Sequence, residues 1–345
     1  MDQKLKVGII GASGYAGVEL IRLLLGHPMV EIAAISSVSF EGKKISDLYP
    51  SLTDICNDTL TDEDTVISQS DVIFAALPHG LSESIGRKCF DLDKLFIDLG
   101  ADFRLEDERD YEKWYGLKYE DQKLHKACIY GLPELFEVKP GLAKIVANPG
   151  CYPTCSSLGL APSLGIVDPK SIIIDAKSGV TGAGRGLSQN LHYAECNESF
   201  TAYKVANHRH IPEIEQTLSK LSNSEVCVTF TPHLLPVNRG ILSTIYANLT
   251  EQLSLEQIHK RYVDFYMNKQ FVKVLDLGKS ANIKDVKLSN YCHISLHLDE
   301  RTNRLIIISA IDNMVKGAAG QAIQNMNILS GWNEETGLLS AAPSF

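Results

Sequence analysis

The sequence has no dense cluster of basic residues and no long apolar run, and each absence excludes a class of protein. Its 345 residues carry 33 Lys and Arg against 42 Asp and Glu, a formal net charge of −9. A protein that binds nucleic acid needs a basic stripe to neutralise phosphates, so we expect no nucleic-acid partner. No stretch approaches the ~20 apolar residues of a membrane span, so we expect no membrane partner either.

The first residues also lack the order of a secretory signal, in which a charged segment precedes an apolar one and then small residues. They run directly into a short apolar segment typical of a first strand. We therefore expect a cytoplasmic protein.

The eight cysteines are not arranged in pairs at metal-ligand spacing. Only Cys151 and Cys155 lie close together in the sequence, and no His or Cys pair at ligand spacing accompanies them. In a cytoplasmic chain such a distribution is typical of reduced thiols that pack as small core residues. The sequence therefore predicts no metal site.

Hydrophobic residues make up 44% of the chain and charged residues 22%, as in ordinary globular enzymes. In the first half, short apolar runs alternate with helical patterns, and the runs span 6–10, 30–35, 72–77, 95–99 and 144–147. Such runs are typical of parallel strands that are buried on both faces. The pattern predicts an α/β protein with an N-terminal Rossmann-type doubly wound parallel sheet.

After about residue 150 the predicted strands are longer, and several alternate polar and apolar residues. The strands span 171–176, 226–231, 242–249, 293–298 and 305–311, with helical patterns at 210–221 and 254–267. This pattern predicts an α+β domain with a mixed, largely antiparallel sheet that helices cover on one face. A last helical stripe follows Asp312, and Asn313 is its predicted N-cap.

A glycine-rich segment joins the first predicted strand to the first predicted helix. Gly11, Gly14 and Gly17 form a G-x-x-G-x-x-G pattern, a variant of the dinucleotide-binding fingerprint. Glycines at these points let the backbone turn tightly and approach a pyrophosphate at the helix N-terminus. The alternative is an ordinary turn from strand to helix.

The end of the second predicted strand favours NADP over NAD. NAD sites usually carry Asp or Glu there to bind the ribose 2′-hydroxyl. This chain has Ser36 and Ser37 instead, followed by Lys43 and Lys44, which suit a 2′-phosphate. Glu41 is the residue that argues against NADP.

Cys151 follows Asn148-Pro149-Gly150 at the predicted start of a helix rich in small residues. The partial positive charge of a helix N-terminus lowers the pKa of a thiol and supplies N–H donors for an oxyanion. These conditions favour a nucleophile that forms thioesters. A cysteine after Pro-Gly is also a common turn residue, so both readings stay open at this point.

Histidines and arginines supply further candidates. His208, Arg209, His210 and Glu213 stand together at a predicted helix start. One imidazole suits a general acid/base, Arg209 or the second histidine suits an anion, and Glu213 suits the orientation of an imidazole or a substrate group. The alternative is a solvated loop. Arg104 and Arg239 follow predicted strands; each alone is a typical surface residue, whereas two together would bind a phosphate.

Taken together, these segments resemble the N-acetyl-gamma-glutamyl-phosphate reductase family along almost the whole chain. The motifs are GASGYAG (11–17), ALPHG (76–80), DLGADFR (98–104), YGLPEL (130–135), NPGCYPT (148–154), SGVTGAGR (178–185), NHRHIPEI (207–214), HLLPVNRG (233–240) and DNMVKGAAGQA (312–322). The wider relatives are aspartate-semialdehyde dehydrogenase and glyceraldehyde-3-phosphate dehydrogenase, which share a two-domain plan.

The resemblance implies an activity and a mechanism. The activity is NADPH-dependent reduction of N-acetyl-L-glutamyl 5-phosphate to N-acetyl-L-glutamate 5-semialdehyde and phosphate, in arginine biosynthesis. By resemblance, Cys151 is the nucleophile that forms a thioester and His210 is the acid/base. Residues 1–148 and 313–345 form the NADP-binding domain, because the last helix returns to it, and residues 149–312 form the catalytic and dimerisation domain. A homodimer or homotetramer is expected.

The remaining site predictions fall into two sets. Cofactor contacts are expected from Gly11, Ser13, Gly14, Tyr15, Gly17, Ser36, Ser37, Pro78, His79, Ser178, Gly179, Asn313, Lys316 and Gly317. Substrate contacts are expected from Arg104, Asn148, His208, Arg209, Glu213 and Arg239. Both ligands are polyanions, so Arg104, Arg185, Arg209, Arg239 and Lys316 are expected to form a local positive pocket.

Three rival functions stay open. Another acyl-phosphate reductase, such as aspartate-semialdehyde dehydrogenase, would need a carboxylate for the free amine of its substrate. A relative that acts on a carrier-bound acyl phosphate would need a basic face. The third rival is a catalytically silent NADP-binding regulator. It would not need a nucleophile, a base and arginines together, and this chain has candidates for all three.

Overall fold

A computed structural model describes residues 4–344 and divides the chain into two compact units. Unit 1 comprises the described residues up to Leu132, together with Val138–Pro149 and Ala318–Leu339. Unit 2 comprises Pro133–Glu137, Gly150–Gly317 and the described residues from Ser340 onward. The chain therefore passes between the units several times, and one of these passages directly precedes Cys151.

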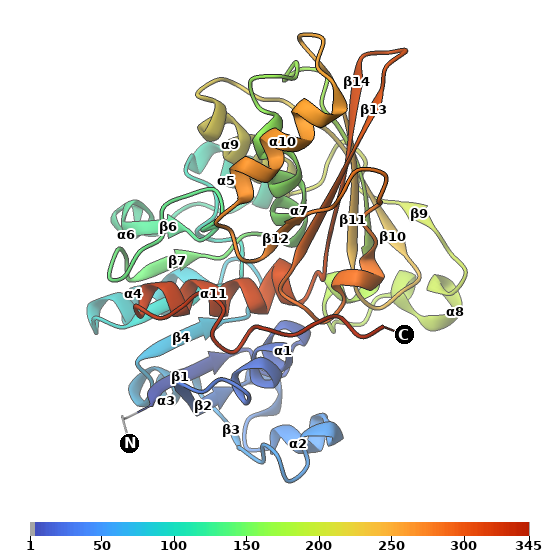
Figure 1. Ribbon diagram of the computed structural model, residues 1–345. Helices are drawn as coiled ribbons and strands as arrows, with labels where there is room; N and C mark the ends of the chain where they lie inside the picture. Colours follow the sequence, from blue (N-terminus) through green and yellow to red (C-terminus); the bar gives the residue numbers. More distant parts are fainter. Residues whose placement is uncertain (1–3, 345) are drawn as a thin grey trace. The chain divides into compact units, whose positions relative to one another are not determined.

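Unit 1 is built on a parallel sheet of seven strands in the order β3-β2-β1-β4-β5-β7-β6 (Figure 1). The strands are β1 (Leu5–Ile10), β2 (Val30–Ser36), β3 (Leu60–Thr61), β4 (Val72–Ala75), β5 (Leu95–Asp98), β6 (Cys128–Tyr130) and β7 (Ile145–Ala147). All four residues of β4 are buried, as expected for a central strand that helices cover on both faces. The order reverses at β1 and β4, which confirms the predicted doubly wound sheet.

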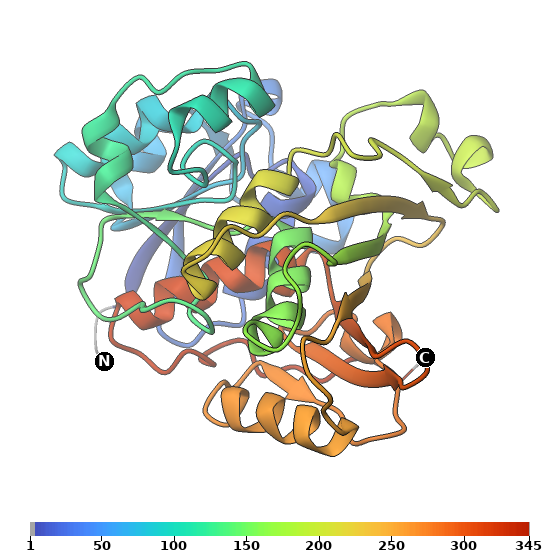
Figure 2. The same ribbon diagram turned by 90° about the horizontal axis from the view of Figure 1, so that it is seen from above.

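The helices of unit 1 connect these strands and cover the sheet (Figure 2). They are α1 (Tyr15–Leu24), α2 (Ile45–Leu48), α3 (Glu63–Gln69), α4 (Ser82–Asp91), α5 (Glu108–Tyr115), α6 (Gln122–Ala127) and α11 (Gly320–Leu329). The late helix α11 packs near α1, and Nε2 of His27 lies 2.9 Å from Oδ1 of Asn327. Residues from the end of the chain are thus part of the first fold unit.

Unit 2 contains a mixed sheet of seven strands in the order β12-β13-β14-β11-β8-β10-β9. The strands are β8 (Ile173–Gly179), β9 (Thr201–Ala202), β10 (Thr229–Leu235), β11 (Ile241–Asn248), β12 (Val272–Val274), β13 (Cys292–Asp299) and β14 (Arg304–Ile311). Two pairs, β8 with β10 and β12 with β13, are parallel, and the other neighbours are antiparallel. The predicted mixed, largely antiparallel sheet is confirmed.

Helices pack on one face of this second sheet (Figure 1). They are α7 (Cys151–Leu160), α9 (Ile211–Ser222) and α10 (Leu255–Tyr266), and a short helix, α8 (Tyr193–Cys196), lies in the excursion before β9. Burial in β11 alternates strictly: Ile241 and Ile245 are buried, whereas Leu242 and Tyr246 are half-buried. The half-buried residues face away from α7, and there Leu242 packs against a small apolar cluster of Ala281, Val286 and Ala310, which includes the 3₁₀ turn Ile283–Val286.

The last helical segment differs from its prediction. Val315–Ala319 is a π-helical turn, and α11 begins only at Gly320. The predicted N-cap, Asn313, is wrong, because Oδ1 of Asp312 accepts the N–H groups of Met314 at 2.8 Å and Val315 at 3.1 Å. A carboxylate that accepts two orphan N–H groups satisfies the start of the segment, which leaves the Asn313 side chain for other contacts.

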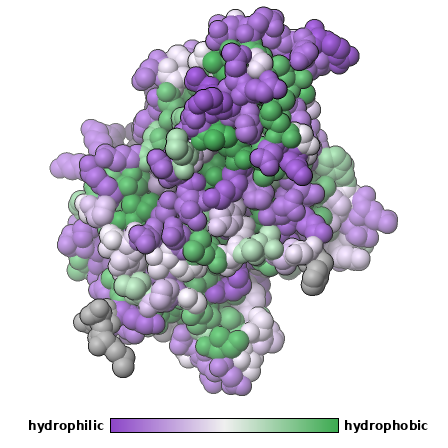
Figure 3. Space-filling model, in the orientation of Figure 1, coloured by the Kyte–Doolittle hydropathy of each residue, from purple (hydrophilic) through white to green (hydrophobic). Residues whose placement is uncertain are grey.

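The surface of the molecule is mixed. On the face drawn in Figure 3, hydrophobic residues form patches that hydrophilic residues separate. No helix within residues 4–344 is long and apolar enough to cross a membrane.

Candidate active site

The glycine-rich turn of unit 1 has the geometry that its sequence predicts. Gly11 has φ +85°, and a Cβ there would lie 2.4 Å from the carbonyl oxygen of Ala76. A Cβ on Gly17 would lie 2.3 Å from the carbonyl oxygen of Gly11. Larger residues are therefore excluded from both positions. Gly14 is the N-cap of α1, and no side chain among the described residues caps it, so the first N–H groups of α1 are left for an anion.

Hydroxyl groups line the end of β2 beside this turn. Oγ of Ser37 lies 2.6 Å from Oγ of Ser13, and Tyr49 donates to the carbonyl oxygen of Ser13 at 2.9 Å. Gly11 and Ala12 donate their N–H groups to the carbonyl oxygen of Ser36. The polar end of β2 is thus attached to the glycine turn, and no carboxylate takes part in these contacts.

The loop after β4 is fixed by a residue that the sequence reasoning missed. Asp102 is buried, and its two carboxylate oxygens accept the N–H groups of Gly80 at 2.7 Å and Ser82 at 2.8 Å. Tyr111 also donates to Asp102, at 2.8 Å. Asp102 therefore fixes the backbone that directly follows the Pro78–His79 segment. The sequence contains a signal for this role, because Asp102 lies inside the DLGADFR motif.

Asp98 ends β5 in the same part of unit 1 and is fully buried. Its Oδ1 accepts the Ser82 hydroxyl at 2.7 Å and the Gly100 N–H at 2.8 Å. Burial, followed by the neighbouring charge of Asp102, raises the pKa of Asp98 to about 7. Ser82 therefore links two carboxyl groups of which one is partly protonated near neutral pH.

Arg104 and Asn148, both predicted to contact substrate, bind the backbone of unit 1. Arg104 is buried and donates from Nε to the carbonyl oxygen of Asn148 at 2.8 Å, and from a terminal nitrogen to that of Leu99 at 2.7 Å. Asn148 donates to the carbonyl oxygen of Ala318 and accepts from Asn325. These contacts fix the end of β7, just before the chain leaves for Cys151.

Cys151 is the first residue of α7 in unit 2 and is half-buried. The N–H of Gly150, the N-cap, donates to Oε1 of the fully buried Glu213 at 2.8 Å. On another side, Gly317 packs so closely that a Cβ there would lie 2.8 Å from Cβ of Cys151. The thiol thus stands at a helix N-terminus, where partial positive charge stabilises a thiolate, and its backbone is held on two sides.

Cys155 lies one helical turn further along α7 and has a different environment. It is fully buried, and its Sγ contacts the carbonyl oxygen of Ser309 at 3.2 Å. Burial raises the pKa of the Cys155 thiol above its ordinary value. A buried thiol with a raised pKa is a poor nucleophile, so Cys151 is the reactive candidate of the two.

The two predicted histidines lie beside each other at the start of α9. Their ring centroids are 4.8 Å apart, and Nδ1 of His208 accepts the backbone N–H of His210 at 3.1 Å. The ring of Tyr152, the residue after Cys151, contacts both imidazoles edge-on. Burial, aided by Lys204 and Arg209, lowers the pKa of His208 to about 4, so this imidazole is neutral at physiological pH.

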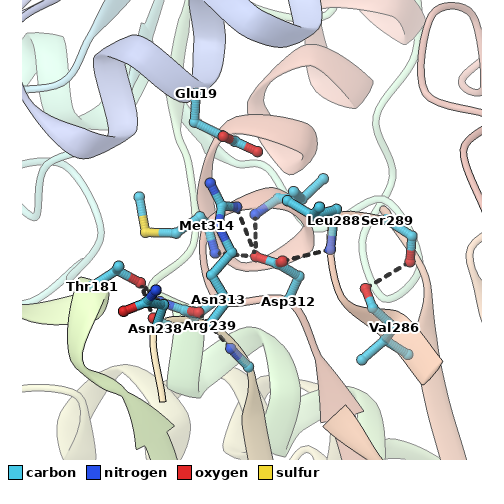
Figure 4. A network of polar contacts seen from close by, with 12 residues as sticks. Glu19, Thr181, Asn238, Arg239, Val286, Leu288, Ser289, Asp312, Asn313 and Met314 are labelled. Carbon is cyan, nitrogen blue, oxygen red and sulfur yellow. Dashed lines mark hydrogen bonds and ion pairs between the residues drawn. The ribbon is translucent and has the colours of Figure 1, made fainter. Parts of the chain in front are cut away.

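Asp312 lies at the centre of a polar network in unit 2 (Figure 4). The guanidinium of Arg239 lies 3.4 Å from Oδ1 of Asp312, and Leu288 donates its N–H to Oδ2 at 2.7 Å. Asn313 accepts the N–H of Gly240 at 2.8 Å and donates to the hydroxyl of Thr181 at 3.0 Å. A Cβ on Gly179 would lie 2.7 Å from the carbonyl oxygen of Asn238. The network therefore connects three predicted site segments, 178–181, 239–240 and 312–313.

The five cations predicted to line one pocket have different placements. Lys316 is fully buried and pairs with Glu134, whereas Arg185 is exposed and Arg209 half-buried. Because its ammonium is already paired inside unit 2, Lys316 is not one of the cations that would surround a ligand. Within residues 4–344, no group of three or more His, Cys, Asp or Glu side chains lies in a metal-binding arrangement.

Known protein families match most of the chain. Residues 6–140 match the NAD-binding domain of the semialdehyde dehydrogenases, and residues 151–313 match their dimerisation domain. Among solved structures, aspartate semialdehyde dehydrogenase II from Vibrio cholerae superimposes with a TM-score of 0.72 at 17% identity, covering 95% of this chain and 98% of that one. The enzyme from Candida albicans, solved with NADP, has a TM-score of 0.69 at 16% identity, covering 95% and 98%. At these identities the similarity concerns the fold.

Sequence relatives give a closer match. An N-acetyl-gamma-glutamyl-phosphate reductase from Clostridium botulinum strain Eklund 17B is 56% identical over 343 residues, which cover 99% of this chain and 100% of the relative. A protein of the same name from Brachyspira hyodysenteriae is 56% identical with the same coverage of both chains. With the glycine turn, the Cys151 helix and the histidine pair all inside the matched length, the chain belongs to the N-acetyl-gamma-glutamyl-phosphate reductase family.

Proposed function

We propose that the protein reduces N-acetyl-L-glutamyl 5-phosphate to N-acetyl-L-glutamate 5-semialdehyde and phosphate, with NADPH as the reductant. The observation that carries this proposal is the position of Cys151 as the first residue of α7, with the two imidazoles against the adjacent Tyr152. A thiolate at a helix N-terminus beside a titratable imidazole is suited to acyl transfer.

The reaction begins with attack of the Cys151 thiolate on the acyl carbon. The bond between that carbon and the phosphate oxygen breaks, phosphate leaves and a thioester forms on Sγ. Backbone N–H groups at the start of α7 stabilise the oxyanion of the tetrahedral intermediate. The N–H of Gly150 takes no part in this, because it donates to Glu213; we therefore infer that Glu213 positions the N-cap of α7 and does not contact substrate.

NADPH, when bound, would supply a hydride to the thioester carbon, which thereby becomes the carbon of a hemithioacetal on Cys151. His210 gives a proton to the oxygen of the hemithioacetal and takes it back as the C=O bond forms and the thiolate leaves. One proton is consumed overall and ends on the released phosphate. The thioester is needed because it persists long enough for reduction, whereas an acyl phosphate hydrolyses readily.

We assign the cofactor site to unit 1 and the catalytic and dimerisation role to unit 2. The close approaches at Gly11 and Gly17 suit a pyrophosphate, and Gly14 and Tyr15 begin the helix that faces it. NADP is favoured over NAD because Ser36 and Ser37 stand at the end of β2, where NAD sites carry a carboxylate, and the Ser37 hydroxyl lies 2.6 Å from that of Ser13 in the glycine turn. Lys43 and Lys44 follow on the exposed segment beyond β2. The cytoplasmic location stays a prediction.

We infer that copies of the chain associate through the second sheet. Tyr246 of β11 and its partner Ile306 of β14 present half-buried apolar side chains on the face opposite α7. They lie next to Leu242 and Ile308, which pack against the cluster of Ala281, Val286 and Ala310. Apolar patches of this kind on a sheet are typical of subunit interfaces. A Tyr246→Arg variant is expected to lower the molar mass measured by light scattering; an unchanged mass would place the interface elsewhere.

The activity is tested in the oxidative direction, with the purified protein, phosphate and NADP. N-Acetyl-glutamate 5-semialdehyde is expected to yield NADPH, and aspartate semialdehyde, the substrate of the rival enzyme, is expected to yield much less. The matched control is Cys155→Ser, which changes the neighbouring buried thiol. Faster turnover of aspartate semialdehyde than of the acetylated substrate would contradict the proposal.

A further inference from the structure

Lys316 lies inside unit 2, although the sequence places it among the cofactor contacts. None of its side chain is exposed, and Nζ lies 2.6 Å from Oε1 of Glu134, whose side chain is 1% exposed. The ammonium also lies over the ring of Phe271, 5.5 Å from its centroid. Desolvating both charges is costly and often leaves such a pair no more stable than an apolar pair of similar size. A role beyond stability therefore has to be sought in what the pair holds in place.

The pair is attached to the π-helical turn Val315–Ala319. In this turn the N–H of Gly317 donates to the carbonyl oxygen of Asp312 at 3.0 Å, five residues back. Asp312 is itself held by Arg239 and Leu288 (Figure 4). One extra residue per turn changes which side chains face the core, and π turns occur frequently at functional sites. The register of this turn decides that Lys316 faces inward.

The next residue, Gly317, packs against the proposed nucleophile. A Cβ on Gly317 would lie 2.8 Å from Cβ of Cys151 and 3.3 Å from its Cα. Any change in the register of the turn therefore moves the backbone that limits the positions of the Cys151 side chain. Because the benefit of a helix N-terminus falls off within one turn, the position of Sγ determines how strongly its thiolate is stabilised.

We propose that the buried Lys316–Glu134 pair fixes the register of the 315–319 turn and thereby positions Cys151. Lys316 and Glu134 are thus positioning residues, and neither contacts the reacting atoms. The proposal rests on the proposed function only in that Cys151 is the nucleophile. It accounts for a fully buried lysine at a position where the sequence suggests a cofactor contact.

The test separates stability from positioning. Removing one partner leaves a buried charge without compensation and is strongly destabilising, whereas replacing both partners with apolar residues of similar volume is often neutral. The double variant Lys316→Met/Glu134→Met therefore keeps the packing and removes the directional bond. Glu134→Gln is a second variant, which keeps the shape of the side chain and removes only its charge.

The matched control is Lys269→Met. Nζ of Lys269 donates to the carbonyl oxygen of Pro133 at 2.8 Å, so this variant also removes a lysine bond to the 133–137 segment. It leaves the Lys316–Glu134 pair and the turn unchanged. Any effect of merely loosening the 133–137 segment would therefore appear in the control.

The readout is the rate at which iodoacetamide alkylates Cys151 as a function of pH, measured on its peptide by mass spectrometry. This experiment needs neither substrate nor cofactor. In the double variant and in Glu134→Gln we expect alkylation near neutral pH to slow by about fivefold and the apparent pKa of the Cys151 thiol to rise, because the rate follows the thiolate fraction. Lys269→Met is expected to match the parent protein.

Two results would overturn the proposal. One is a folded double or Glu134→Gln variant with the parent rate and pH profile. The other is equal slowing in Lys269→Met. Should one of the two test variants fail to fold, the other decides the question alone. A protein with no reductase activity would refute the proposed function but leave the alkylation comparison valid.

Discussion

The backbone N–H of His210 donates to Nδ1 of His208 at 3.1 Å. Because Nδ1 of His208 accepts this hydrogen bond, the neutral imidazole carries its proton on Nε2. Burial keeps the pKa of His208 near 4, so His208 is a neutral support for the start of α9. His210 is then the imidazole that is suited to proton transfer, a distinction that the sequence motif HRH does not contain.

Replacing His210 with Asn is expected to lower kcat by about 100-fold or more while changing KM little, because it removes proton transfer and leaves binding intact. Steady-state kinetics in both directions measure the two constants. A variant whose KM rises while kcat is kept would show that His210 binds substrate instead. His208→Gln serves as a comparison for a general loss of packing at this site.

The low pKa of His208 makes stability depend on pH. The unfolded state binds a proton near pH 6.5, whereas the folded state resists it until about pH 4. The unfolded state therefore holds more protons in this window, and the contribution of His208 is lost as the pH falls through it, by about 3 kcal/mol in total. Thermal melts of His208→Gln between these pH values should lack this loss. An unchanged pH slope would refute the assignment.

Asp98 is expected to act in the opposite direction. Its pKa rises from 3.8 unfolded to about 7 folded, so the folded state holds more protons between these values and stability falls as the pH rises. The two effects partly cancel in the parent protein. In Asp98→Asn, the slope of the free energy of unfolding against pH should become more positive. In His208→Gln, the same slope should become more negative. Slopes that change in the same direction would contradict one of the two assignments, namely that of the variant whose slope changes with the wrong sign.

The choice of NADP depends on the hydroxyls at the end of β2. Ser37→Asp places a carboxylate where NAD sites have one and where it would repel a 2′-phosphate. We expect the ratio of kcat/KM for NADPH to that for NADH to fall by about tenfold or more, since two like charges would meet. This ratio is independent of the fraction of protein that is folded. An unchanged ratio would place the 2′-phosphate elsewhere, and Glu41→Gln is the matched control.

Much of the fold could be predicted because strong local patterns determine it. The apolar runs of β1, β4 and β5 and the alternation in β11 each follow from burial on two faces or on one. The short edge strands β3, β6 and β9, of two or three residues, have too few residues for a pattern. Their pairing depends on neighbours that are distant in the sequence.

In the candidate site, too, features with a local sequence pattern could be predicted, whereas features that depend on distant parts of the chain could not. Gly11, Cys151 and the histidine pair are candidates that the sequence alone predicts, because their proposed chemistry requires particular residues next to turns and helix starts. The roles of Lys316 and Asp312 were missed, since a lysine is expected at the surface and a π turn has no simple sequence pattern. Glu213 was identified, but its partner, the N–H of Gly150, is visible only once α9 and α7 are packed together.

A single-turnover experiment tests the central claim most directly. With N-acetyl-glutamate 5-semialdehyde and NADP but no phosphate, oxidation should stop at the thioester on Cys151. We predict a burst of about one NADPH per chain, as covalent catalysis requires, an N-acetylglutamyl group on the Cys151 peptide, and renewed turnover when phosphate is added. Cys155→Ser should behave like the parent protein, and Cys151→Ser should show no burst. A full burst from Cys151→Ser, or steady turnover without phosphate, would contradict the account.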